Sequence, residues 1–299
     1  MKPRHLIISL LAVVLLINSC GVSRRKSSPV YHAGEPLQEG YTPRGRVVEV
    51  NYDCSVPGPT NRRMIVYLPE GYDDSPDTSY PVLYLLHGAR GYETSWIIKG
   101  RAQQICDSLF SAGLATPCIL VMPNVNQYNN DSDYDGSRRK EAFESIWEVD
   151  GIVESAFMDD VVATADSMFR TIPAKGSRAL AGLSIGATQS AVISAKENQE
   201  FGYVGVLSPY FRVRGRGGPY REDTYGDFFE NMEDQFSSDS DLNYRIYIGD
   251  SDFLRHSVYR FHRRLDAKGF KHDYIVLDGG HSWVVWRAAL TDFLQNIFI

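Results

Sequence analysis

The stretch GLSIG at residues 182–186 indicates the fold of this chain of 299 residues. The preceding residues 178–181, RALA, predict a short strand, and the small residues that follow Ser184 as far as Ala195 predict a helix. A serine on a sharp turn between strand and helix needs small neighbours, because the backbone must bend tightly to present the hydroxyl. The context therefore favours a nucleophilic Ser184 over the alternative, a tightly packed turn with an incidental serine.

Strands and helices alternate on both sides of this turn. Apolar runs at 81–86 and 118–122 are typical of strands buried on both faces. The remaining expected elements are strands at 203–207, 244–248 and 274–277 and helices around 102–112, 156–169, 257–268 and from 283 to 298. Strand-like runs at 47–50 and 64–68 flank a turn and predict an antiparallel pair. The pattern predicts an α/β fold with a mostly parallel, doubly wound sheet and an antiparallel N-terminal strand pair.

The first twenty residues differ from the rest of the chain. Lys2 and Arg4 precede an apolar run at 6–17, too short to cross a bilayer of about 30 Å and typical of a secretory signal. The stretch INSC at 17–20 resembles the lipobox of bacterial lipoproteins, which implies a lipid on Cys20. Because Gly21 rather than an aspartate follows, the resemblance implies outer-membrane delivery, with the membrane face left open. The alternative is an ordinary cleaved signal.

Residues 21–43 lack hydrophobic periodicity and are interpreted as a tether to a single catalytic domain at 44–299. A composition of 43% hydrophobic and 23% charged residues is ordinary for a globular domain. The net charge of -6 gives no basic surface for nucleic acid. Cys54, Cys106 and Cys118 fit no zinc pattern and are expected to be structural, with at most one disulfide among them.

A serine hydroxyl needs a base that takes its proton, and a later histidine can supply it. His281 is the expected base, since the stretch GGHSW at 279–283 follows a predicted strand and its glycines let the loop turn back over the sheet. The acid that orients this histidine should come between the two in the chain. The stretch GDSD at 249–252 follows a predicted strand, and Asp250 and Asp252 both qualify by position.

An oxyanion hole needs two backbone N–H groups aimed at the charge that develops on a carbonyl oxygen. One is expected from Ile185, directly after the serine. The other is expected from the loop HGARG at 87–91, with Ala89 as the first choice. His87 is expected to brace this loop with its side chain.

The chain from about 45 to 298 resembles the esterase family that contains esterase D and carbohydrate esterase family 1. Its known members include S-formylglutathione hydrolases, siderophore esterases, mycolyltransferases, feruloyl esterases and acetylxylan esterases. The matching motifs are RMIVYLP at 63–69, YPVLYLLHG at 80–88, VMPN at 121–124, AGLSIG at 181–186 and GHSW at 280–283. The resemblance implies an α/β-hydrolase fold and favours Asp252 over Asp250 as the acid. Ala187 departs from the family pattern, in which a glycine is common, but it is also small.

The implied reaction is ester hydrolysis through an acyl-serine intermediate, with no cofactor and no catalytic metal. An exported, lipid-anchored enzyme cannot readily serve cytosolic formaldehyde detoxification, so we expect an acylated oligosaccharide as substrate. We expect hydroxycinnamoyl (feruloyl) groups on hemicellulose fragments, ahead of acetyl groups. The alternatives are an acyltransferase, an esterase for another ester, and a non-catalytic glycan-binding lipoprotein.

Aromatic residues near the expected site are candidates for substrate binding, because aromatic faces suit sugar rings and phenolic acyl groups. Trp96 follows the expected oxyanion loop, and Trp283 follows His281. The aromatic-rich segment 209–243 is expected to be a loop over the site.

The stretch DSDYDG at 131–136 matches the first half of an EF-hand calcium loop. Ala142 stands at its twelfth position, where a bidentate glutamate is needed. We expect a solvated acidic loop, with a peripheral structural calcium as the alternative.

Overall fold

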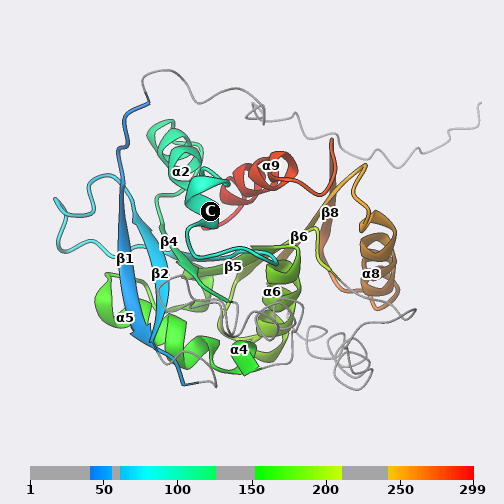
Figure 1. Ribbon diagram of the computed structural model, residues 1–299, viewed down its shortest axis with the longest axis horizontal. Coiled ribbons are helices and arrows are strands. Elements are labelled where there is room, and N and C mark those ends of the chain that lie inside the picture. Colours follow the sequence, from blue (N-terminus) through cyan, green and yellow to red (C-terminus); the bar gives the residue numbers. More distant parts are fainter. Residues whose placement is uncertain (1–40, 56–60, 126–151, 211–241) are drawn as a thin grey trace, which may run out of the picture. The chain divides into compact units, whose positions relative to one another are not determined.

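The computed structural model describes residues 41–55, 61–125, 152–210 and 242–299 (Figure 1). Within them lies an eight-stranded sheet with the order β1-β2-β4-β3-β5-β6-β7-β8. The strands are β1 (Arg46–Asp53), β2 (Asn61–Leu68), β3 (Val82–Leu86), β4 (Ile119–Pro123), β5 (Arg178–Leu183), β6 (Tyr203–Leu207), β7 (Asn243–Gly249) and β8 (Asp273–Leu277).

The sheet changes direction only at its N-terminal side. Strand β2 pairs antiparallel with both β1 and β4, whereas every neighbouring pair from β4 to β8 is parallel. The prediction of a mostly parallel, doubly wound sheet with an antiparallel N-terminal pair is confirmed. Because parallel strands end at the same edge of the sheet, the loops that follow β3, β5, β7 and β8 meet there.

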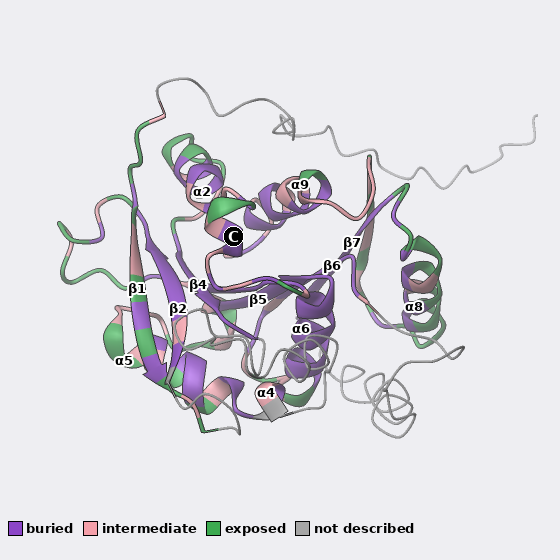
Figure 2. Cartoon of the chain, in the orientation of Figure 1, coloured by how far each residue is buried: buried purple, intermediate pink, exposed green. Residues whose placement is uncertain are grey.

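Helices cover both faces of the sheet (Figures 1 and 2). Successive strand side chains enter opposite layers: Tyr84 belongs to one hydrophobic cluster, and Leu83 and Leu85 belong to the other. The helices of the first layer are α4 (Ile152–Ser155), a π-helical turn (Phe157–Val162), α5 (Ala163–Met168), α6 (Ile185–Lys196) and α8 (Arg255–Ala267). Those of the second layer are α1 (Ser95–Ile98), α2 (Ala102–Ser111) and α9 (Trp283–Leu294).

Two expected helices differ from the observed ones. Helix α9 ends at Leu294 instead of continuing to 298, and the Asn296 side chain donates to the carbonyl of Asp292 at 2.7 Å. This bond satisfies one of the carbonyl groups that a helix end leaves without a partner. The helix expected at 156–169 begins as a π-helical turn and becomes α-helical only at Ala163.

The last part of the expected tether contacts the domain. Tyr41 and the backbone N–H groups of Arg44 and Gly45 all donate to the buried carboxylate of Asp107 on α2, at 2.5–3.0 Å. These bonds join residues 41–45 to α2, and the rest of the expected tether lies outside the described residues. None of the helices in the described ranges is both long and apolar enough to cross a membrane.

Candidate active site

Three predicted residues meet at the carboxyl edge of the parallel strands. Ser184 follows β5, Asp252 lies in the loop after β7, and His281 lies in the loop after β8. The Nε2 atom of His281 lies 3.1 Å from the Ser184 Oγ, and its Nδ1 atom lies 2.9 Å from an Asp252 carboxylate oxygen. This is the hydrogen-bonded order in which a carboxylate orients an imidazole that can take a proton from a serine.

Ser184 occupies a strained turn. Its backbone has φ 54° and ψ −117°, an uncommon conformation for a residue with a side chain, and its N–H donates to the Leu207 carbonyl of β6 at 2.9 Å. The turn is possible because glycines, which have no side chain, stand where the chain comes into close contact with neighbouring backbone. A Cβ on Gly182 would overlap the Gly186 carbonyl, and one on Gly186 would overlap the His87 carbonyl. The expected strand, turn and helix are thus present.

Position in the sequence does not decide whether Asp250 or Asp252 is the acid. In the structure the two carboxylates have different partners. The second oxygen of Asp252 accepts the Leu254 N–H at 2.9 Å, and its side chain is fully buried. Asp250 instead accepts the Gly279 N–H at 3.0 Å and the Ser251 hydroxyl, and so joins its loop to the loop that carries His281. Only Asp252 contacts the imidazole.

The protonation of Asp252 follows from its partners. Burial by itself would raise the pKa of this carboxyl, but the hydrogen bonds from His281, from the Leu254 N–H and from the Ser208 side chain outweigh it and hold the pKa below the usual value. Asp252 is therefore the ionised partner of His281 at neutral pH.

Ser208 is a residue that the sequence analysis missed. It lies directly after β6, is fully buried and has φ 50°. Its hydroxyl contributes to lowering the pKa of Asp252 and accepts the Trp286 indole N–H at 3.3 Å. The available signal was positional, because Ser208, like Ser184, directly follows a buried parallel strand.

The two expected oxyanion donors lie on adjoining segments. Ile185 opens α6, and the loop with Ala89 packs against it, since Ala89 and Tyr210 contact the cluster of Ile185 and Val192. In the described part of the chain, neither the Ala89 nor the Ile185 N–H donates to a protein acceptor. Both N–H groups are free to bind an anionic oxygen.

His87 braces this loop, as expected. Its Nδ1 lies 2.8 Å from the Gly88 carbonyl, and its Nε2 accepts the Val125 N–H at 3.1 Å. Burial lowers the pKa of His87 to about 4, although its hydrogen bonds to Gly88 and Asn124 oppose this shift. The imidazole is therefore neutral at physiological pH and fixes the loop as a neutral group.

A buried ion pair lies at the far end of the same loop. The Glu93 side chain is fully buried, accepts both Nε and an Nη of Arg63 at 2.7 and 2.5 Å, and accepts the Asn124 amide at 3.0 Å. The sequence offered no signal for this pairing, because Arg63 on β2 and Glu93 are brought together only by the sheet order. The pair ties the loop to β2 and to the end of β4.

The two tryptophans expected to bind substrate differ in how far they are buried. The prediction for Trp96 is wrong: its side chain is 1% exposed, and its indole N–H donates to the Leu86 carbonyl at 3.0 Å, so it is a core residue. Its ring packs edge-on against Trp283, at 5.2 Å between centroids. Trp283 is half-buried, and its binding of substrate stays a prediction.

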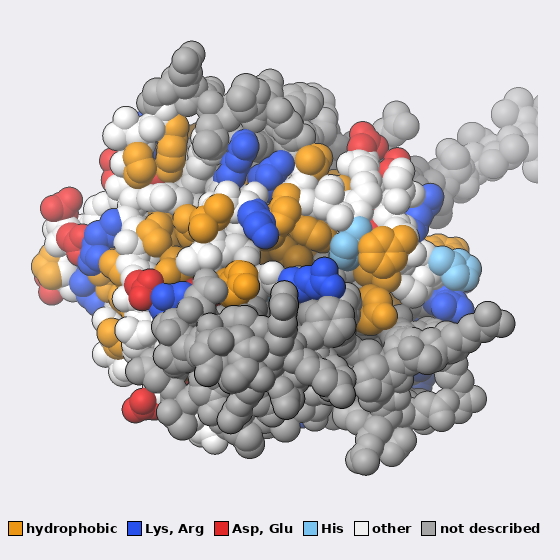
Figure 3. Space-filling view, viewed as in Figure 1, with side chains coloured by type: hydrophobic (Ala, Val, Ile, Leu, Met, Phe, Trp, Pro, Cys, Tyr) orange, Lys and Arg blue, Asp and Glu red, His pale blue; other side chains and the backbone are white. Residues whose placement is uncertain are grey.

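An exposed apolar side chain lies beside His281 instead. Phe253 is 73% exposed, and its ring centroid lies 4.7 Å from that of the imidazole. Ile98 and Val284, on α1 and α9, are 71% and 40% exposed. Figure 3 shows hydrophobic side chains gathered beside a histidine on the face that it presents.

Some expectations lie outside the described residues. They are the stretch at 131–136 and nearly all of the aromatic segment 209–243; of the latter, Tyr210 is described and its N–H donates to the Thr188 hydroxyl. No disulfide joins Cys54, Cys106 and Cys118 to one another, and burial raises the pKa of Cys106 and Cys118 above the usual value. These two thiols are structural, as expected.

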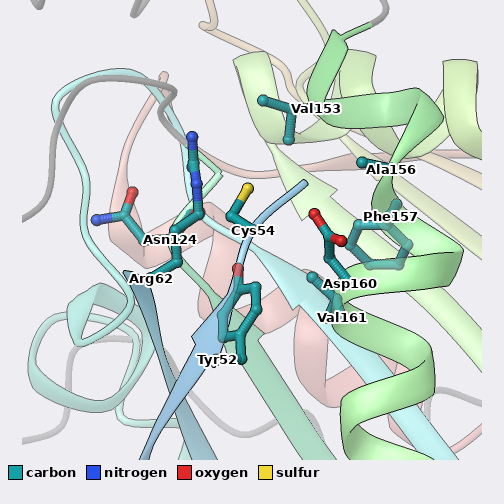
Figure 4. Close-up of a pocket in the computed structure, with 9 residues that line it drawn as sticks. All are labelled: Tyr52, Cys54, Arg62, Asn124, Val153, Ala156, Phe157, Asp160 and Val161. Atoms are coloured by element: carbon teal, nitrogen blue, oxygen red, sulfur yellow. The ribbon is translucent and has the colours of Figure 1, made fainter. Parts of the chain in front are cut away.

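A small cavity lies away from Ser184, between β1, β2 and the π-helical turn (Figure 4). Tyr52, Cys54, Arg62 and Asp160 are among its lining residues, and its volume is about 10 Å³. A volume of this size holds about one water molecule. The cavity is too small for an ester substrate.

Comparison with known proteins gives the family. The model of the family described as "Putative esterase" matches residues 57–297. This chain belongs to that family. The esterase therefore has the α/β-hydrolase fold predicted from its motifs, and it is a carboxylic ester hydrolase.

Relatives of this esterase are consistent with that assignment. An endo-1,4-beta-xylanase/feruloyl esterase of Xylanibacter ruminicola is 32% identical over 239 residues, which are 78% of this chain but only 29% of the relative. The solved ferulic acid esterase of Anaeromyces mucronatus, of carbohydrate esterase family 1, has a TM-score of 0.70 and 24% identity, with 91% of this chain and 96% of that chain covered. The feruloyl esterase module of Clostridium thermocellum has a TM-score of 0.66 and 19% identity, with 89% and 91% covered. At these identities, the two solved structures support the fold alone.

Proposed function

We propose that this esterase hydrolyses its substrate through an acyl-serine intermediate, with Ser184 as nucleophile, His281 as general base and Asp252 as the orienting acid. The observation that carries the proposal is the continuous chain of hydrogen bonds from Asp252 through His281 to Ser184. The Nδ1–H of His281 donates to Asp252, which leaves the lone pair of Nε2 facing the Ser184 hydroxyl.

The reaction then runs in two halves. His281 takes the proton of Ser184 as Oγ attacks the ester carbonyl, and the Ala89 and Ile185 N–H groups stabilise the oxyanion. The same imidazole returns the proton to the departing alcohol. Water, activated by His281, then releases the acid and restores Ser184. The buried Asp252 carboxylate stabilises the imidazolium in both halves.

The proposed substrates are feruloyl or related hydroxycinnamoyl esters on hemicellulose fragments, with acetyl esters second. The xylanase/feruloyl esterase name of the Xylanibacter ruminicola relative supports this substrate class. The exposed ring of Phe253 and the half-buried Trp283 also support it, because apolar and aromatic surface beside the serine suits a phenolic acyl group.

Export and anchoring complete the proposal. The short apolar run and the lipobox-like INSC at 17–20 support a lipoprotein anchored through Cys20, with the outer membrane as its destination. Such a location would expose the esterase to oligosaccharides outside the cytoplasm.

The test of the substrate class compares kcat/KM for three esters: methyl ferulate, a feruloylated arabino-oligosaccharide and an acetylated xylo-oligosaccharide. We expect the feruloylated sugar to give the highest value, because only it offers both the phenolic acyl group and the sugar. Activity on simple esters with none on any decorated oligosaccharide would contradict the substrate class and leave the serine mechanism intact. Absence of activity on every ester would contradict both.

A further inference from the structure

Three potential metal ligands gather where α8 joins β8. His262 and Asp266 are four residues apart on α8 and face the same side of the helix, and His272 precedes β8. The His262 Nδ1 lies 2.8 Å from the His272 Nε2. The Asp266 carboxylate oxygens lie 3.4 Å from the His262 Nε2 and 4.0 Å from the His272 Nε2. One ligand atom from each of the three side chains fits within 4.8 Å of the other two.

The ring of His272 is fixed by its backbone. Its Nδ1 lies 2.8 Å from the Phe270 carbonyl, which can only accept, so the proton is on Nδ1. The lone pair of Nε2 therefore faces the cluster. A backbone carbonyl on the other ring nitrogen is the support that metal-binding histidines commonly have.

The ring of His262 is also held in place. It stacks on Tyr274 of β8, with 4.3 Å between ring centroids and 8° between planes. The His272 side chain is 1% exposed, that of His262 is 19% exposed and that of Asp266 is 42% exposed. The cluster is thus closed on the His272 side and open to solvent at Asp266, from which an ion can enter.

The hydrogen bond between the two imidazoles sets the direction of the His262 lone pair. Because the His272 Nε2 accepts, the proton of neutral His262 is on Nδ1, and the Nε2 lone pair of His262 faces the Asp266 carboxylate. These two atoms lie 3.4 Å apart, and the Arg263 Nη1 lies 3.7 Å from the same Asp266 oxygen. A cation among the three side chains would share this carboxylate with Arg263, and the tautomer of His262 can adjust to offer either nitrogen.

The distances suit a small ion. In a tetrahedral site with metal–ligand bonds of about 2.0–2.1 Å, neighbouring ligand atoms lie about 3.3–3.4 Å apart. One ligand atom from each of the three residues lies within 4.8 Å of the other two, and the His262 Nδ1 lies 2.8 Å from the His272 Nε2, so small side-chain shifts reach this value. Rotation of the exposed Asp266 side chain is the main adjustment required.

We propose that His262, Asp266 and His272 bind one divalent transition-metal ion of the Zn²⁺ type, with water as a fourth ligand. Two imidazoles and one carboxylate are a ligand set for zinc, copper or nickel, whereas calcium and magnesium prefer oxygen ligands alone. The ion joins the end of α8 to the start of β8. Since the carboxyl end of β8 leads to His281, the ion lies at the opposite edge of the sheet from Ser184, and its role is to stabilise the fold.

The test uses the untagged full-length chain after treatment with a chelator and dialysis. Calorimetric titration with Zn²⁺ should give about one ion per chain, and Zn²⁺ at about 100 times its Kd should raise the Tm by several degrees. Asp266→Asn and His262→Gln should each weaken Zn²⁺ binding at least tenfold. His256→Ala is the matched control, because His256 is exposed on the same helix outside the cluster, and its Zn²⁺ affinity should equal that of the wild type.

Co²⁺ gives a direct view of the ligands. The wild type should acquire the visible absorption of a four-coordinate Co²⁺ ion, and Asp266→Asn should lose it. Asp266 is exposed, so this variant keeps the test valid even where a change at the buried His272 prevents folding. Equal Zn²⁺ affinity in wild type and Asp266→Asn, an equal loss in His256→Ala, or an equal Tm rise with Mg²⁺ would each overturn the proposal.

Discussion

The Nε2 atom of His281 lies 3.1 Å from the Oγ atom of Ser184, although 97 positions separate the two residues in the chain. This distance rests on backbone contacts between neighbouring loops. The Ser251 N–H donates to the Gly279 carbonyl at 3.0 Å, and a Cβ on Gly249 would overlap that same carbonyl. The loop with the acid thus supports the loop with the base.

Loss of either Ser184 or His281 should remove most of the activity. We expect Ser184→Ala and His281→Ala each to lower kcat by about 10⁴-fold or more on a chromogenic ester, because each removes an indispensable part of one proton-transfer unit. Both variants should keep the wild-type circular dichroism spectrum. Full activity in Ser184→Ala would disprove the serine mechanism.

The two aspartates should differ in their contribution. Asp252→Asn should lower kcat by about 10⁴-fold, because an amide in place of the carboxylate favours the wrong imidazole tautomer. Asp250→Asn should cost far less, since an amide oxygen can still accept the Gly279 N–H. The measurement is kcat for both variants on one ester. Equal or reversed losses would assign the acid role to Asp250.

Ser208 should act as a positioning residue for Asp252. Ser208→Ala removes a hydrogen bond to a carboxylate and leaves the buried Trp286 indole N–H without that acceptor. A bond to a charged group contributes about 1.5–3 kcal/mol, which corresponds to a fall in kcat of about 10–100-fold with KM unchanged. Ser194→Ala is the control, because Ser194 is equally buried but bonds only within α6. Equal losses in the two variants would indicate a general packing effect.

His87 should make stability depend on pH. The pKa of His87 is about 4 in the folded protein and 6.5 ordinarily. Between these two pH values the unfolded chain therefore binds a proton at His87 and the folded chain does not. The contribution of neutral His87 is present above about pH 6.5, is lost as the pH falls, and levels off below about pH 4. The shift corresponds to ~3 kcal/mol. Urea unfolding between pH 7 and 4 should show a smaller fall in unfolding free energy for His87→Gln than for wild type; parallel curves would contradict this.

Cys20 should determine where the protein is found. Cys20→Ala removes the proposed lipid-bearing thiol, so we expect the esterase to leave the membrane fraction while its kcat stays unchanged. Metabolic labelling with a fatty-acid analogue provides the direct measurement. Absence of label on the wild-type chain would show that the lipobox interpretation is wrong.

Most of the fold could be predicted from local sequence patterns. The runs that became β3 and β4 are continuously apolar because both faces of these strands are buried, and the GLSIG stretch needs its glycines for close backbone contact. His281 was predictable because glycines precede it at the end of a strand. Ser184 and His281 could therefore be predicted from the sequence, because the backbone geometry around each of them requires glycines as neighbours.

Side-chain partners across the sheet were not predictable in this way. Trp96 was misjudged because its place after the oxyanion loop does not reveal that its ring turns into the core. The choice between Asp250 and Asp252 rested on family resemblance, since two residues in one turn differ only in the direction of their side chains. The contact of Ser208 with Trp286 depends on how α9 packs beside the end of β6, and the contact of His262 with His272 depends on how α8 packs beside β8. No local pattern encodes either contact.

The contact between Gly186 and the His87 carbonyl has a consequence for engineering. Because α6 and the oxyanion loop touch backbone to backbone, no side chain fits between Gly186 and the His87 carbonyl. A library that randomises this contact would return mostly misfolded proteins. Selection for new acyl groups should instead vary the exposed Phe253 beside His281, where the backbone places no such restriction on side-chain size.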